Sequence, residues 1–164
     1  MFTKIKPKSM SIEEAVANLK LGKSLNISNH SKVSGIISPR VATDIEQFVS
    51  DHEHFEILVD RPERIEHFTD DLPDAAWDLL DLNQEYLQLS FVVKRGLPKA
   101  MLDIESIPFR VIKSGDAQNF LRRLNGVILL AKPKANPKPN LALDLLYPGT
   151  CEHIRFDASG RISV

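Results

Sequence analysis

Apolar residues recur at two different spacings along the chain, and these spacings alternate. Helical spacing covers Ile12 to Leu19, where Ser11 and Glu14 stand at capping-box separation and Gly22 suits the end of a helix. The same periodicity predicts further helices over residues 39–49, 62–68, 73–82 and 116–124. Alternating or continuous apolar runs predict strands over residues 25–27, 33–37, 55–59, 86–93, 109–112 and 127–130, and a closing hairpin of 153–156 with 161–164.

Strands that alternate with helices are typical of an α/β domain, and the closing hairpin adds antiparallel pairing to its sheet. The turn at residues 157–160 separates the two strands of this hairpin. A chain of 164 residues is long enough for one hydrophobic core. The sequence therefore predicts a single α/β domain over residues 1–164, built on a twisted, open, mixed sheet with flanking helices.

The composition is that of an ordinary globular protein, with 43% hydrophobic and 26% charged residues. Cys151 is the only cysteine, which excludes a disulfide scaffold and fits a reducing compartment. The apolar run over residues 127–131 is too short to cross a bilayer, and the basic N-terminus meets Glu13 and Glu14 before any apolar stretch. We therefore expect a cytoplasmic protein with no membrane segment.

Charge is distributed unevenly along the chain although the net charge is only -1. Residues 1–40 carry seven Lys and Arg against two Glu, and residues 83–164 carry twelve against seven acidic residues. Residues 41–82 carry only two Arg against thirteen Asp and Glu. A fold that joins the two basic segments would have one basic and one acidic face, and the basic face would attract phosphates. The alternative is that the acidic segment is the solvated surface of helices.

Searches for common catalytic motifs find none in this chain. There is no Walker A sequence, no G-x-G-x-x-G and no G-x-S-x-G elbow. His52 and His54 flank Glu53, but no third spaced ligand follows them, so we expect no metal site. Cys151 has no predicted helix start or histidine beside it and is interpreted as a passive thiol. We assign no catalytic residue.

The segment Lys132–Asn140 directly follows an apolar strand and contains three lysines. In α/β folds, ligands bind beyond the carboxyl ends of strands. The three lysines, Lys132, Lys134 and Lys138, and Asn136 would hold phosphate or carboxylate groups there. The alternative is a stiff, solvated, proline-rich surface loop.

The order of these features resembles the YrdC-like threonylcarbamoyl-adenylate synthase family over nearly the whole chain. Asn29–Ile36 occupies the place of the family's P-T-E-T-V-Y-G-L loop and keeps a Val-x-Gly-Ile skeleton. Ile107–Val111 resembles its V-A-V-R-x-P strand, and Lys134–Pro139 resembles its S-A-N-x-S-G loop. The strands at 57–59 and 90–93, the acidic stretch 65–80 and the closing segment 151–160 also match in order. The resemblance implies a YrdC/RibB-like fold.

The family joins ATP, threonine and bicarbonate into threonylcarbamoyl-adenylate for a tRNA modification. Its ATP-binding Lys-x-Arg pair is replaced here by residues 49–54, Val-Ser-Asp-His-Glu-His. His30 or a neighbour stands for its threonine-binding Thr, and Lys134 stands for the serine of S-A-N. The stretch between this loop and the last hairpin is shortened to residues 140–150. Loss of two charge-assisted contacts, at about 1.5–3 kcal/mol each, predicts that synthase activity is lost or reduced.

The resemblance and the charge pattern together predict one ligand site. Its expected binding residues are Lys32, Arg110, Lys132, Lys134 and Asn136. The ligand is a nucleotide, with ATP implied by the resemblance alone, or the phosphates of an RNA such as tRNA or a duplex. RNA binding would be weak, sequence-independent and sensitive to salt, because the basic loop has no aromatic residue for base stacking. Two alternatives stay open: a working synthase, and a protein-interaction module that uses the acidic helices of residues 61–82.

Overall fold

Within the part of the chain that the computed structural model describes, residues 9–82, 87–102, 106–146 and 151–163, nine strands form one mixed sheet. Their order is β7-β1-β2-β6-β3-β5-β4-β8-β9. The strands are β1 (Leu25–Asn29), β2 (Lys32–Ile37), β3 (His52–Val59), β4 (Leu87–Phe91), β5 (Ile107–Val111), β6 (Val127–Pro133), β7 (Leu141–Ala142), β8 (Glu152–Phe156) and β9 (Ile162–Ser163). The pairs β1–β7, β3–β5 and β4–β8 are parallel and the others are antiparallel.

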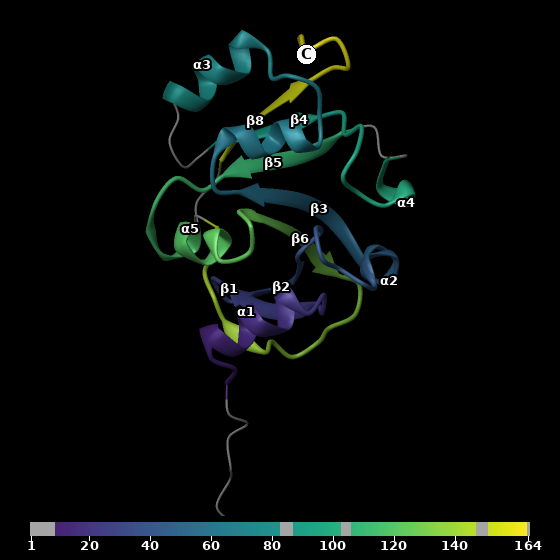
Figure 1. Ribbon diagram of the computed structural model, residues 1–164, viewed down its shortest axis with the longest axis vertical. Coiled ribbons are helices and arrows are strands. Elements are labelled where there is room, and N and C mark those ends of the chain that lie inside the picture. Colours follow the sequence, from purple (N-terminus) through teal and green to yellow (C-terminus); the bar gives the residue numbers. More distant parts are fainter. Residues whose placement is uncertain (1–8, 83–86, 103–105, 147–150, 164) are drawn as a thin grey trace, which may run out of the picture.

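Helices flank this sheet on both faces, and the predicted α/β class is confirmed. They are α1 (Ile12–Lys20), α2 (Ile45–Asp51), the 3₁₀ helix η1 (Pro62–His67), α3 (Asp74–Leu82), α4 (Lys99–Leu102) and α5 (Gly115–Arg122). The sheet runs through the molecule from β1 and β2 beside α1 to β4 and β8 beside α3 (Figure 1). No helix in the described ranges is long and apolar enough to cross a bilayer.

The two faces of the sheet carry two separate cores. The first core packs α2, η1, α3 and α4 against β3–β6, and includes Ile57 and Val59. The second core packs α1 and α5 against the β1–β2–β6–β3 half, and includes Leu58. Both faces of β6 are covered, so its residues Val127–Ala131 read as a continuous apolar run rather than an alternating one.

The sheet face that carries the second core becomes polar beyond β3, at strands β5 and β4. In β4, Leu87, Leu89 and Phe91 belong to the first core, so Gln88 and Ser90 occupy the opposite face. In β5, Arg110 alternates in the same way between two core residues. Polar side chains thus line the β5–β4 part of the face that α1 and α5 cover elsewhere. The fold leaves a polar sheet face where a site can form.

Some predicted elements start or end elsewhere. The helix expected from Pro39 begins only at Ile45, because residues 39–44 form a turn and bends. Gly22 packs directly against this turn, since a Cβ on it would lie 2.6 Å from the carbonyl oxygen of Val41. The strand expected to end at residue 130 extends to Pro133.

Other elements were not predicted at all. The expected loop between the first two strands is a two-residue hairpin turn, in which His30 and Ser31 both have positive φ (46° and 70°). This is the backbone of a type I′ turn, which Asn-Gly usually signals. The short helix α4 and the two-residue strand β7 also carry no periodic signal. The predicted positions Tyr86 and Val164 lie outside the described residues, as does the basic N-terminal segment 1–8.

Candidate functional site

A hollow of about 450 Å³ lies where β2 begins and β6 ends; we call it the lysine hollow. Lys32 contributes from the start of β2, Lys132 from the end of β6, and Asn136 from the loop that follows. All three side chains are exposed. The rest of the lining is Ser31, Val33, Ser34, His54, Leu130, Pro133, Ala135 and Pro137. No carboxylate lines this hollow, so its field favours an anion.

A second hollow of about 820 Å³ shares His54 with the first; we call it the glutamate hollow. It lies at the ends of β3, β5 and β4 on the polar sheet face. Its lining is Val49, His52, Glu53, His54, Phe55, Glu56, Gln88, Ser106, Ile107, Pro108 and Lys134. Glu53 and Lys134 have opposite charges and Glu56 is paired with Arg110, so the hollow has no excess positive charge for a polyanion.

Arg110 lies beneath the glutamate hollow in a buried ion pair. Its Nε donates to Oε1 of Glu56 at 2.7 Å, and the two side chains are 7% and 9% exposed. Its Nη2 lies 3.3 Å from Sγ of Cys151. Since a buried carboxylate without a partner is very unfavourable, Arg110 is held by Glu56 and is not displayed to a ligand.

A bulge in β3 positions the residues between the two hollows. The pairing of β3 with β6 shifts register between Glu53 and Glu56, and His54 has a φ of 55°. On the same strand Nδ1 of His52 lies 2.7 Å from the carbonyl oxygen of Phe48, and the two rings stack at 3.9 Å. Such bulges re-aim side chains at sheet rims, and this one directs His54 toward both hollows.

Gly35 in β2 packs against the imidazole ring of His52. A Cβ on it would lie 2.2 Å from Nε2 of His52, so only glycine allows the imidazole to pack against the strand. This residue is the glycine of the Val-x-Gly-Ile skeleton seen in the sequence. Its role here is close packing, because its φ is not positive.

The five residues expected to bind ligand do not all meet. Lys32, Lys132 and Asn136 come together in the lysine hollow, Lys134 lines the adjoining glutamate hollow, and Arg110 is buried in its pair with Glu56. An ion pair links the two hollows at their rim, since Nζ of Lys132 lies 4.0 Å from Oε1 of Glu53.

Sequence reasoning did not identify Glu56 and Gln88, which line the glutamate hollow, or Ser90, which lies on the same polar sheet face. Glu56 interrupts an otherwise apolar strand, and Gln88 and Ser90 stand at alternate positions of another. Polar residues at period two within buried strands are the signal of a polar sheet face, and that signal was available. Ser90 also accepts or donates a 2.6 Å hydrogen bond with Nε2 of His153 on the neighbouring strand β8.

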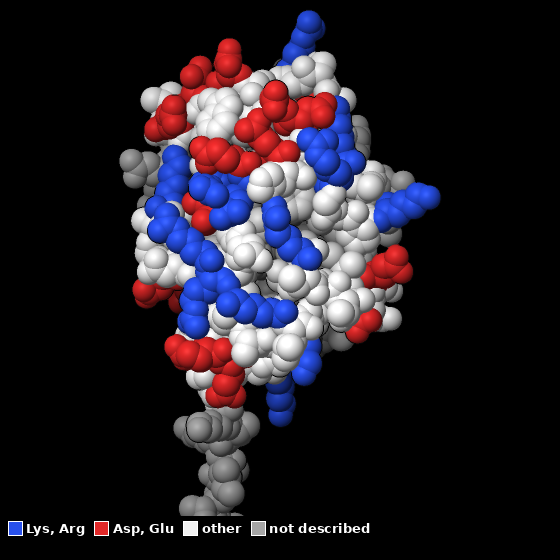
Figure 2. Space-filling model, in the orientation of Figure 1, with Lys and Arg blue, Asp and Glu red and all other residues white. Residues whose placement is uncertain are grey.

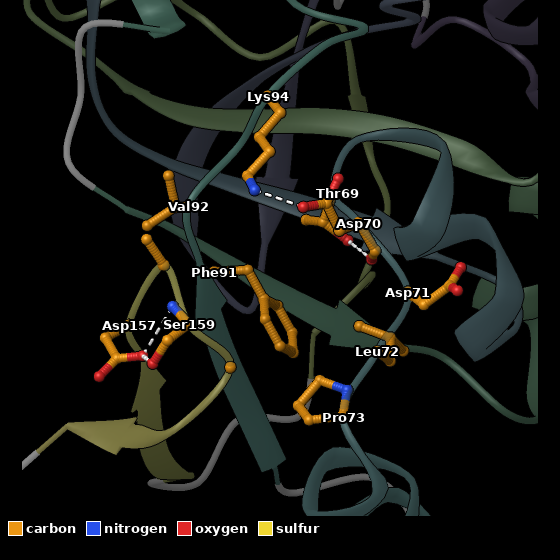
Figure 3. A pocket seen from close by; sticks show the side chains of 12 residues that line it. Thr69, Asp70, Asp71, Leu72, Pro73, Phe91, Val92, Lys94, Asp157 and Ser159 are labelled. Atoms are coloured by element: carbon orange, nitrogen blue, oxygen red, sulfur yellow. Dashed lines mark hydrogen bonds and ion pairs between the residues drawn. The ribbon is translucent and has the colours of Figure 1, made fainter.

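A third hollow of about 290 Å³ lies away from these residues, between the η1–α3 connection and the turn after β8. Lys94 extends toward Asp70 on one side of it, and Asp157 bonds to Ser159 on the other (Figure 3). The bond to Lys94 lowers the pKa of the Asp70 carboxyl, and the bonds from Ser159 and the Arg161 amide lower that of Asp157. None of the five residues expected to bind ligand lines this hollow, so it is not the predicted site.

Among the residues that the structure describes, no three His, Cys, Asp or Glu side chains gather as metal ligands would. His52 and His54 lie on one strand, but the stacking of His52 on Phe48 and its bond to the carbonyl oxygen of that residue occupy its ring.

Comparison with known proteins identifies solved structures of similar fold but no match to a family model or a curated protein. Among solved structures, P. abyssi Sua5 complexed with L-threonine matches 88% of this chain with a TM-score of 0.68 and 12% identity. E. coli YciO matches 89% of it with a TM-score of 0.65 and 14% identity. A full-length HypF in a phosphate- and nucleotide-bound form matches 88% with a TM-score of 0.57 and 12% identity.

These matches define a YrdC-like α/β fold, as the sequence resemblance predicted. The chain spans about half the length of Sua5, with 50% of that protein covered, and 84% of YciO. At identities this low, the comparisons establish the architecture and not the chemistry.

Proposed function

We propose that this chain is a YrdC-like domain that binds phosphate groups of a nucleotide, free or within RNA, in the lysine hollow. Its setting is the biosynthesis of threonylcarbamoyladenosine in tRNA, with synthase activity lost or reduced. The observation that carries the proposal is that Lys32, which lies far in the sequence from Lys132 and Asn136, lines one hollow with them, and that no carboxylate is in its lining.

The charges of the lysine hollow suit a phosphate. Two ammonium groups and one amide surround a space of about 450 Å³, which exceeds the volume of a phosphate group and admits part of a nucleotide. Lys132 is 66% exposed and is only loosely paired with Glu53 at 4.0 Å, so that pairing is easily exchanged for a ligand. The HypF structure similar to this fold was itself solved with phosphate and nucleotide bound.

The charges of the glutamate hollow argue against full synthase chemistry. The family resemblance aligns a Lys-x-Arg pair with residues 49–54, which here contribute Glu53 and His54 to the hollow. Glu56 adds a second carboxylate and also takes the charge of Arg110. A triphosphate in this space would lack the cations that the family supplies, and the electrostatic contribution to such a reaction would be lost or reduced.

Isothermal titration with ATP tests the binding site. Lys32→Ala and Lys132→Ala should each weaken binding about tenfold, the usual loss for a partly exposed charged hydrogen bond of about 1.4 kcal/mol. Lys138→Ala is the matched control, because this exposed lysine lies on the loop that follows β6 and lines neither hollow. Equal weakening by all three variants would show a general charge effect and contradict the assignment.

Lys134 tests whether the two hollows act together. If a ligand extends into the glutamate hollow, Lys134→Ala weakens ATP binding by about 1–2 kcal/mol, and Lys134→Ser does not restore synthase activity. If Lys134 instead blocks the space, Lys134→Ala tightens binding. Tighter binding by the mutant would overturn this part of the proposal.

The enzyme alternative is separated by turnover. Wild-type protein is incubated with ATP, threonine and bicarbonate, and release of pyrophosphate is followed. We expect little or none above the blank. Robust threonine-dependent release would establish the working synthase and refute the loss of activity.

A second candidate function rests on the acidic side chains, which gather at the α3 end of the molecule (Figure 2). Such a surface would contact a basic protein partner. Reversal of Asp78 and Asp81, both on α3, should abolish capture of that partner, while removal of the charges at Lys132 and Lys138 should not.

A further inference from the structure

Five arginines from separate segments form one basic surface at the other end of the central strands; we call it the arginine band. Its members are Arg40, Arg61, Arg64, Arg122 and Arg123. Arg40 follows β2. Arg61 is the N-cap of η1 and Arg64 lies within that helix. Arg122 is the last residue of α5 and Arg123 is its C-cap. Arg61 and Arg64 are the only two basic residues in the acidic segment 41–82.

Asp60 joins two members of the band. This carboxylate is 5% exposed at the end of β3, and its Oδ1 accepts from Nε of Arg64 at 2.9 Å. Its Oδ2 lies 3.7 Å from Nε of Arg122, which is 61% exposed. Two guanidinium groups thus share one buried carboxylate, and one positive charge remains in excess.

The remaining members extend the band on both sides. Arg40 donates to Nδ1 of His67, on the same 3₁₀ helix as Arg64. Burial and then the nearby charges of Arg40, Arg64 and Arg61 lower the pKa of His67, so protonation of this ring beside the arginines is disfavoured. At the other end, Arg123 is 45% exposed and lies 3.9 Å from Glu13 of α1.

The arginine band is separate from both candidate hollows. Lys and Arg side chains cross one face of the molecule as a band below the acidic side chains around α3 (Figure 2). Strand β3 runs from the glutamate hollow to Asp60, a distance on the order of 20 Å at the usual rise of a strand. None of the five arginines lines any of the three hollows described above.

We propose that the arginine band binds the phosphate backbone of a nucleic-acid duplex. The guanidinium fork matches a phosphate with two parallel hydrogen bonds, which a lysine does not provide. Five such groups from separate segments, with no enclosing hollow, fit several phosphates better than one small anion. A duplex presents about one charge per 1.7 Å of its axis, and neutralising those charges releases counterions. This inference stands on residues other than those of the proposed function.

Fluorescence anisotropy with a labelled RNA duplex of about 16 base pairs measures this binding. The double variant Arg61→Ala/Arg122→Ala should weaken binding tenfold to about a hundredfold, and lower the slope of log affinity against log salt by about two. Lys99→Ala/Lys138→Ala is the charge-matched control, since both lysines are exposed and line neither hollow. Arg40→Ala/Arg123→Ala repeats the test without touching Asp60.

Three further arms separate the sources of binding. Lys32→Ala/Lys132→Ala asks whether the duplex uses the lysine hollow instead; loss of binding there with retention in both arginine variants would overturn the proposal and leave the proposed function intact. Polyglutamate that competes as well as duplex RNA would assign the band to an acidic protein and also overturn it. A DNA duplex of the same length is expected to bind comparably, because the contacts proposed are to phosphates. No salt-dependent binding of either duplex would refute the band as a nucleic-acid surface.

Discussion

Three glycines separate the two ways in which an added Cβ destabilises this fold. Gly115 has a φ of +81° and nothing within 4 Å of its Cβ position, so alanine there brings backbone strain alone. Gly35 has ordinary φ but would place a Cβ 2.2 Å from His52 Nε2, so alanine there brings a clash alone. Gly126 combines both, with a φ of +77° and a Cβ position 2.4 Å from Arg64 Nε and from Asp60 Oδ1.

The expected costs follow from these geometries. A left-handed alanine costs about 1–2 kcal/mol, reduced by the lower entropy of the unfolded chain, so Gly115→Ala should cost about 1 kcal/mol. Gly35→Ala forces the His52 ring off Phe48 and should cost about 2 kcal/mol, within the range for overpacked cores. Gly126→Ala adds the strain to a clash that must part the buried Arg64–Asp60 pair, and should cost about 3 kcal/mol or more.

Urea denaturation followed by circular dichroism measures all three free energies of unfolding. The order expected is Gly115→Ala, then Gly35→Ala, then Gly126→Ala as the least stable. If Gly126→Ala were no less stable than Gly115→Ala, the packing of the ion pair against that glycine would be refuted. Gly35→Ala should also perturb the His52 ring signals in an NMR spectrum, which neither other variant should do.

Three other predictions concern single polar groups. Asn29 is 7% exposed, and its Oδ1 accepts hydrogen bonds from the amides of Leu145 and Leu146 at 2.9 and 3.3 Å. Asn29→Ala should therefore lower the free energy of unfolding by about 1–3 kcal/mol. Asn140→Ala, at an exposed residue whose Oδ1 accepts from the Asn26 amide, should cost less, and thermal unfolding compares the two variants. The pKa of His67 lies below 6.5, because of burial and then of the charges of Arg40, Arg64 and Arg61. The folded state therefore disfavours its protonation, stability falls as pH drops through about 6.5 toward the folded pKa, and Arg40→Ala should raise the pKa seen by NMR. The hydrogen bond from the Ser159 side chain is the largest cause of the lowered pKa of Asp157. The contribution of Asp157 to stability is therefore present above the ordinary Asp pKa and is lost as pH falls through the folded pKa. Ser159→Ala should raise the pKa of Asp157 toward 3.8, and an unchanged pKa would contradict this hydrogen bond.

Much of the fold follows from periodicity because both faces of the central strands are covered. Apolar runs such as Val127–Ala131 are long enough to be found without any alignment, and capping signals such as Ser11 with Glu14 are confirmed by the bond from the Glu14 amide to Ser11 Oγ. The hairpin turn at His30 and Ser31 was missed because its left-handed residues are not glycine or asparagine. The tertiary bond from His30 N to Asp144, at 2.7 Å, supports that turn and carries no local signal.

The candidate site was only partly accessible to sequence reasoning. The family resemblance and the charge pattern grouped Lys32, Lys132 and Asn136, and the antiparallel pairing of β2 with β6 brings the start of one strand beside the end of the other. Whether Arg110 faces a ligand depends on which side chain reaches it from the neighbouring strand β3. That partner is Glu56, 54 residues earlier, and no local pattern identifies it.

The two buried carboxylates at and just after β3 explain why counting cations did not locate the proposed anion-binding surfaces. Glu56 and Asp60 are both nearly inaccessible, at 6% and 5% exposure, and each must keep a cationic partner because an unpaired buried charge is strongly destabilising. At Glu56 one arginine serves one carboxylate, so Arg110 has no charge left for a ligand. At Asp60 two arginines serve one carboxylate, and the excess charge adds to that of the neighbouring arginines. An arginine in this fold therefore counts toward phosphate binding only after its buried carboxylate partner has been subtracted. When the charges are counted in this way, the electrostatic field at the Asp60 end of β3 is positive, and the field around Arg110 is not.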